Sequence, residues 1–130
     1  MKEDYVSYEV AKLLKEKGFD WECNQIYFSD NPSIYLGYKN INHNEDVTTI
    51  SAPTHQMAMR WLREVHKIII SFNASFFNSI EQHFDWNIRI NSLKYLDDKE
   101  HFDPIYINTK SEVFEEAVED AIKYCLTNLF

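Results

Sequence analysis

The sequence predicts a two-layer α+β domain, in which three helices cover an antiparallel sheet of four to five strands in the order αββαββα. Three observations predict it. Ser111–Phe130 has the apolar period of a helix, Phe84–Asn91 alternates strictly between apolar and polar residues, and turn residues at Ser29–Pro32 separate two strand-like stretches. Short connections favour antiparallel pairing, with helices on one face of the sheet. The 130 residues fit a single globular domain, 1–130.

The first helix is predicted over Tyr8–Lys17. Ser7 precedes it and suits the N-cap, because its hydroxyl can accept a hydrogen bond from the first helical turn. Gly18 suits the left-handed position that follows a helix, and Phe19 can then pack back on Leu14. These signals together predict a Schellman motif at the end of this helix.

Two strands and a short third one are expected next. Glu22–Phe28 and Ser33–Lys39 form a predicted β-hairpin around the turn at Ser29–Pro32. The asparagine-rich stretch Asn40–Asp46 is expected to be a loop, and Val47–Ile50 to add a short edge strand. The second strand should place its alternate apolar residues on one face: Ile34, Leu36 and Tyr38.

The second helix is predicted to open at Pro53 and Thr54. Its buried stripe follows helical spacing: Met57, Ala58, Trp61, Leu62 and Val65. The β-branched run Ile68–Asn73 then predicts a strand. The clearest strand is Phe84–Asn91, where Phe84, Trp86, Ile88 and Ile90 should face the core and the polar residues should face solvent or a partner. The stretch 74–82 fits either a longer strand or a loop.

The final helix follows an acidic stretch, Tyr95–Asn108, that is expected to be irregular. Thr109 and Glu112 form a candidate capping box for this helix. Its apolar residues fall within one stripe about 140° wide: Phe114, Ala117, Val118, Ala121, Ile122, Cys125 and Leu129. The glutamates lie on the other side, and those in the first turns complement the helix dipole: Glu112, Glu115, Glu116 and Glu119.

The charge and composition limit the classes of function that this chain can have. The formal net charge is −8, and Asp97–Asp120 alone holds nine acidic and two basic residues, a net of −7. This balance argues against direct binding to nucleic acid, which uses clustered Lys and Arg. Two cysteines without a signal-like apolar start indicate a reducing, cytoplasmic location. The longest apolar run, Ile68–Ile70, is too short to cross a membrane.

No arrangement of reactive residues compels a chemistry. His55 and His66 share a helix face but lie three turns apart, roughly 16 Å, which one metal ion cannot bridge. Cys125 falls in an apolar stripe, and the carboxylate of Glu22 beside Cys23 would raise the pKa of that thiol. We therefore predict no catalytic, cofactor-binding or metal-ligating residue, and no cofactor.

Three segments resemble proteins of one group: YEVAKLLKEKGF at Tyr8–Phe19, SAPTHQMAMRWLREVH at Ser51–His66 and EEAVEDAIKYCL at Glu115–Leu126. The group consists of small proteins encoded in gut anaerobic bacteria and in their phages or mobile elements, and it has no assigned activity. The resemblance covers the three helices. It implies a cytoplasmic, phage-linked setting and transfers no functional residue.

Aromatic residues make up 15% of the chain, and they favour a protein contact, because Tyr and Trp are enriched at the centres of interfaces. We therefore predict a non-enzymatic protein-binding or adaptor domain, with self-association through open edge strands as a further expectation. Two alternatives stay open: an acidic nucleic-acid mimic that blocks a DNA-binding protein, and a small enzyme with a pocket between sheet and helix. The predicted contact residues are Tyr27, Tyr35, Tyr38, Asp97, Asp98, Glu100, Glu112 and Glu116.

Overall fold

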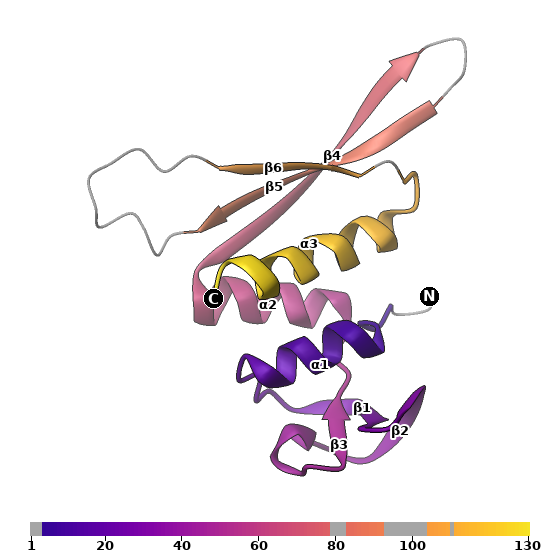
Figure 1. The fold of residues 1–130 in the computed structure, drawn as a ribbon, viewed down its shortest axis with the longest axis vertical. Coiled ribbons are helices and arrows are strands. Elements are labelled where there is room, and N and C mark those ends of the chain that lie inside the picture. Colours follow the sequence, from indigo (N-terminus) through magenta and orange to yellow (C-terminus); the bar gives the residue numbers. More distant parts are fainter. Residues whose placement is uncertain (1–3, 79–82, 93–103, 110) are drawn as a thin grey trace, which may run out of the picture. The chain divides into compact units, whose positions relative to one another are not determined.

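The structure, a computed structural model, describes residues 4–78, 83–92, 104–109 and 111–130. This part of the chain has an α+β fold with three α-helices, a short 3-10 helix and antiparallel strands (Figure 1). In chain order the elements are α1 (Tyr8–Glu16), β1 (Cys23–Phe28), β2 (Asn31–Ile41), η1 (His43–Glu45), β3 (Thr49–Ser51), α2 (His55–His66), β4 (Ile68–Asn78), β5 (His83–Ser92), β6 (Ile105–Thr109) and α3 (Phe114–Asn128). The α+β class and the three helices are confirmed.

The expectation of one sheet of four to five strands is wrong. The described strands form two antiparallel sheets of three strands each, in the orders β2-β1-β3 and β4-β5-β6. Each sheet is built from three strands that follow one another in the sequence, which lowers the entropy cost of closing the connections between them. Helix α2 lies between the two sets of strands along the chain. The chain accordingly divides into two compact units, one with residues up to Ala58 and Ile122–Phe130, the other with Met59–Ala121.

In the first unit, helix α1 begins at Tyr8 as its sequence predicts and ends at Glu16, one residue before the predicted end. The Ser7 hydroxyl accepts a hydrogen bond from the Val10 amide at 3.2 Å, and Gly18 has a φ of +91°. The Phe19 amide donates to the Leu14 carbonyl at 2.9 Å, and the Gly18 amide donates to Lys15. These two bonds are those of a Schellman motif, which satisfies carbonyls that the helix end would otherwise leave without partners.

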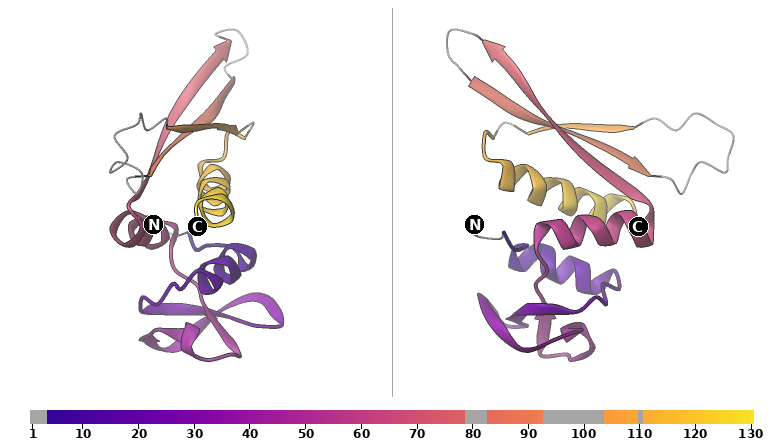
Figure 2. Two further views of the ribbon diagram at one scale, coloured as in Figure 1. Left: turned by 60° about the vertical axis from the view of Figure 1, so that its left-hand side comes forward. Right: turned by 180° about the vertical axis from the view of Figure 1, so that it is seen from behind.

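The predicted hairpin is also confirmed, with a tighter turn. Strands β1 and β2 pair antiparallel with Phe28 opposite Asn31, so that only Ser29 and Asp30 lie between the strands, and a register shift separates this pair from Tyr27 opposite Ile34. Strand β3 pairs with the other edge of β1, as the predicted edge strand should. Helix α1 lies against this sheet (Figure 2), where the Tyr8 and Tyr27 rings meet edge to face at 5.5 Å.

Gly37 marks a close approach within this sheet. A Cβ there would lie 2.8 Å from the Asn24 carbonyl oxygen and 2.9 Å from Nε2 of His43, whose ring donates to the Lys39 carbonyl. Since a backbone oxygen cannot move alone, Gly37→Ala should lower the free energy of unfolding by about 1–3 kcal/mol, measured by urea denaturation. Gly18→Ala is the control for backbone strain without a clash, and a Gly37→Ala variant as stable as the wild type would contradict this packing.

Helix α2 starts one residue after the predicted opening, because the Thr54 hydroxyl accepts from the Met57 amide at 3.2 Å. The stripe residues Ala58, Trp61 and Leu62 are buried. Val65 is 51% exposed, so that part of the predicted stripe is wrong. Helical period fixes the face of a side chain but not how far along the helix that face is covered.

The second unit is organised around β5. Phe72 and Ile107 lie opposite Ile88 on the two neighbouring strands, and Ile88 and Ile90 are fully buried. The predicted alternation holds for Ile88 and Ile90, but Asp85, which was expected to face solvent or a partner, is only 8% exposed. Strand β4 extends to Asn78, which assigns Ala74–Asn78 to a strand. Strand β6 corrects the expectation that the stretch up to Asn108 is irregular. The alternation Ile105-Tyr106-Ile107-Asn108 is a short strand pattern beside acidic residues.

The start of α3 differs from the predicted capping box. Thr109 ends β6, and its hydroxyl donates to the Trp86 carbonyl at 3.2 Å, so it is not available to cap a helix. Ser111 serves this end instead, because its hydroxyl accepts from the Val113 amide and donates to the Glu116 carboxylate. Five residues of the predicted stripe are fully buried: Ala117, Val118, Ala121, Ile122 and Cys125. Phe114 stays partly exposed and its ring packs on those of Phe72 and Trp86.

Candidate binding surfaces

The predicted tyrosines of the first hairpin have different surroundings. Tyr27 is only 6% exposed, and its hydroxyl donates to the Val6 carbonyl at 2.8 Å. Its ring therefore belongs to the interior, because its side of β1 is covered by α1. Tyr35 is 42% exposed, and its hydroxyl accepts from the Asn31 amide. The side chain of Tyr38 lies outside the described residues.

Of the predicted acidic residues, only Glu112 and Glu116 are described, and they lie in a different unit from the tyrosines. Asp97, Asp98 and Glu100 lie outside the described residues. Glu112 and Glu116 are exposed in the second unit, near the start of α3. The Glu112 carbonyl accepts from Nε1 of Trp86 at 3.0 Å, and the Glu116 carboxylate accepts from Ser111, so both residues take part in holding this helix end.

The exposed apolar side chains of β2, together with Phe28, form the first candidate surface. Leu36 is 76% exposed, and Ile34 lies two residues away on the same side of β2. On the other side, the rings of Tyr35 and Phe28 meet edge to face at 5.3 Å. We call this set the hairpin surface: Phe28, Ile34, Tyr35 and Leu36, each more than a third exposed.

The backbone of β2 adds to this surface. Strand β2 is at the edge of its sheet, and no described strand pairs with its outer side. Natural edge strands are often protected by charged residues or proline. Here Pro32 and Lys39 stand at the two ends, whereas Ser33–Tyr38 holds no charged residue. This segment therefore offers both apolar side chains and backbone hydrogen-bonding groups.

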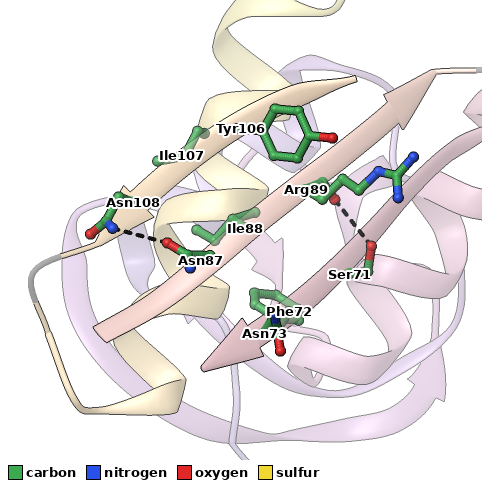
Figure 3. A pocket seen from close by; sticks show the side chains of 9 residues that line it. All are labelled: Ser71, Phe72, Asn73, Asn87, Ile88, Arg89, Tyr106, Ile107 and Asn108. Carbon is green, nitrogen blue, oxygen red and sulfur yellow. Dashed lines mark hydrogen bonds between the residues drawn. The ribbon is translucent and has the colours of Figure 1, made fainter. Parts of the chain in front are cut away.

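The second candidate surface is a hollow of about 530 Å³ on the β4-β5-β6 sheet (Figure 3). Its polar side chains come from alternate positions of all three strands, and we call them the polar hollow: Ser71, Asn73, Asn87, Arg89, Tyr106 and Asn108. The intervening Phe72, Ile88 and Ile107 point to the opposite face, where Phe72 meets the Phe114 ring of α3. The hollow therefore lies on the outer face of this sheet.

Strand register arranges the polar hollow in two rows. Asn73, Asn87 and Asn108 lie directly opposite one another across the three strands, and the Asn108 amide donates to Oδ1 of Asn87 at 2.9 Å. The next row along the strands is Ser71, Arg89 and Tyr106. The sequence did predict that the polar face of Phe84–Asn91 would meet solvent or a partner. The residues of β6 were missed, although their alternation was a usable signal.

The two cysteines are buried in the first unit and do not form a reactive site. Burial raises the pKa of the Cys23 thiol from 9.0 to about 12, and it does the same for Cys125. A thiol with such a pKa is almost wholly protonated near neutral pH, and the thiolate is the reactive form. The Cys23 thiol donates a weak hydrogen bond to Met57 Sδ at 3.8 Å.

Among the described residues, no three His, Cys, Asp or Glu side chains are grouped closely enough to hold a metal ion. His43 is instead buried, with its ring bonded to a backbone carbonyl. No described helix has the length and apolar character needed to span a membrane.

Comparison of the chain with protein-family models, with curated proteins and with solved structures finds no match. The function proposed below is therefore argued from the hairpin surface, and its cellular setting from the resemblance of the three helices.

Proposed function

We propose that this chain is a non-enzymatic protein-binding domain that works as an adaptor in a cytoplasmic, phage-linked setting. The hairpin surface is its contact site. The observation that carries the proposal is Leu36, a large apolar side chain 76% exposed on an edge strand, with the exposed Ile34 on its own side of the strand and Tyr35 with Phe28 exposed on the other side. Exposed apolar side chains gathered on one edge strand mark interaction sites more often than isolated exposed residues do.

The geometry supports strand addition as the mode of contact. A partner segment in extended conformation can pair with the outer side of β2, and alternate side chains would then meet its two faces. Ile34 and Leu36 would contact the partner on one face, and Tyr35 with Phe28 on the other. Main-chain hydrogen bonds supply affinity in this mode, and the apolar contacts supply selectivity.

A capture experiment with matched variants tests this proposal. The tagged wild-type protein is incubated with native lysate of its host, and bound proteins are quantified by mass spectrometry. Leu36→Asp should lower recovery of a stoichiometric partner at least tenfold, because the charge would be buried in an apolar contact. Val113→Asp is the control, since Val113 is also apolar and exposed but lies in the second unit.

Two further measurements separate the alternatives. Sedimentation velocity of the pure protein tests whether the partner is a second copy, in which case Leu36→Asp should abolish the larger species. Repeating the capture at low and high salt tests the acidic mimic, whose binding would weaken steeply with salt. The proposal fails if the folded protein captures no stoichiometric partner and does not self-associate, or if Leu36→Asp binds as the wild type does.

A further inference from the structure

We propose that the polar hollow of the β4-β5-β6 sheet is a saccharide-binding site. A sugar ring would stack on the Tyr106 side chain, and its hydroxyl groups would bond to the asparagine row and to Arg89. This site is independent of the hairpin surface, because the two lie in different units and share no residue.

Tyr106 provides the apolar platform that a sugar ring needs. It is 70% exposed on β6, and its ring lies on the outer side of the sheet beside Arg89 (Figure 3). A tyrosine ring offers a flat apolar face together with a polar edge, which suits a ligand that is apolar on one face and polar around its rim. No folding reason is evident for this exposure, because the inner side of β6 already supplies Ile105 and Ile107.

The asparagine row supplies the chemistry that hydroxyl groups require. A sugar hydroxyl both donates and accepts hydrogen bonds, and so does each side-chain amide. Asn73 and Asn108 are exposed at the two ends of the row. The bond from Asn108 to Asn87 fixes the orientation of the Asn108 amide before a ligand arrives, which lowers the ordering cost of binding.

The dimensions of the hollow suit a ligand of one or two sugar rings. The two rows are two residues apart along each strand, about 7 Å, and neighbouring strands lie about 4.8 Å apart. A ring stacked on Tyr106 can therefore reach the asparagine row with its rim. The volume of about 530 Å³ lies within the range of small-molecule sites.

The charge of the hollow favours a neutral ligand over a nucleotide strand. Arg89 is the one charged side chain among the residues that line it, and the whole chain carries a formal charge of −8. Proteins that bind single-stranded nucleic acid combine stacking aromatics with a groove of several basic residues. The described lining also holds no carboxylate, imidazole or thiol, which favours binding over catalysis.

Saturation-transfer NMR on the full chain tests the site. The probes are four uncharged disaccharides, namely cellobiose, maltose, lactose and N,N′-diacetylchitobiose, with AMP and a dT hexamer as comparison ligands. At least one disaccharide should bind saturably, and Tyr106→Ala should lower its affinity at least tenfold. Asn108→Ala should weaken it several-fold, and Tyr106→Phe, which keeps the ring, should retain most of the binding.

Tyr35→Ala is the matched control, because Tyr35 is also an exposed strand tyrosine but belongs to the hairpin surface. It should leave saccharide binding unchanged, just as Tyr106→Ala should leave partner capture unchanged. Circular dichroism confirms that each variant is folded. The inference is overturned if no disaccharide binds saturably, if binding survives Tyr106→Ala, or if only AMP or the dT hexamer binds.

Discussion

Replacing Trp61 by alanine is expected to lower the free energy of unfolding by about 3–5 kcal/mol. Trp61 is only 1% exposed, and its ring meets that of His66 edge to face at 4.5 Å. The change removes the largest fully buried side chain among the described residues and leaves a cavity that neighbouring groups fill only in part. Because whole domains are stable by about 5–15 kcal/mol, the variant should unfold at a much lower urea concentration.

Two variants make this measurement specific. Trp61→Phe keeps an aromatic ring in the same place and should cost distinctly less than Trp61→Ala. Val65→Ala changes an exposed residue of the same helix and should alter the free energy of unfolding by no more than about 0.5 kcal/mol. A Trp61→Ala cost close to that of Val65→Ala would contradict the buried position of the tryptophan.

Local structure could be predicted from the sequence where the determining residues are neighbours in the chain. Ser7 and Gly18 define the ends of α1 because capping involves residues only three to five positions apart. The stripe of α3 is equally local, since it depends on helical period alone. Thr109 shows the limit of such signals. It matches a capping pattern, yet its hydroxyl is used by Trp86, 23 residues away in the sequence.

The pairing of strands could not be predicted in the same way. The alternation in Phe84–Asn91 places Ile88 and Ile90 on the inner face, although Asp85 is also buried, and it carries no information on which strands lie beside it. A single sheet and two smaller sheets satisfy the same alternation. The division into two sheets depends on both edges of β1 and of β5 being occupied by strands near them in the chain.

The candidate sites show the same limit at the level of single residues. Tyr27 and Tyr35 both belong to one hairpin, but Tyr27 is an interior residue that contacts the Tyr8 ring and the Val6 carbonyl, whereas Tyr35 is exposed. The asparagine row of the polar hollow combines Asn73, Asn87 and Asn108, which are brought into line by register alone. The sequence predicted that Tyr35 would be exposed, but it could not predict that three asparagines from separate strands would lie side by side.

The second large effect expected is a loss of stability in alkaline solution, caused by the two buried thiols. Burial raises the pKa of Cys23 and Cys125 to about 12, whereas an unfolded chain has thiols with a pKa near 9.0. Between these pH values the folded protein keeps protons that the unfolded chain has lost. The two buried thiols therefore make their full contribution to the free energy of unfolding below about pH 9. This contribution is lost as the pH rises toward 12, with a slope of at most about 1.4 kcal/mol per pH unit for each thiol.

Urea denaturation at pH 7.5, 9, 10 and 11 measures this slope. Tyrosines and lysines also titrate in this range, so the wild type is compared with the Cys23→Ala/Cys125→Ala variant, in which only the thiol contribution is removed. The wild type should lose stability more steeply above pH 9 than the variant does. A thiol reagent such as DTNB should also react slowly with the folded protein at pH 8 and rapidly in urea. Equal slopes for the two proteins, or fast reaction of the folded one, would show that the thiols are accessible to water and that these two core positions are wrongly placed.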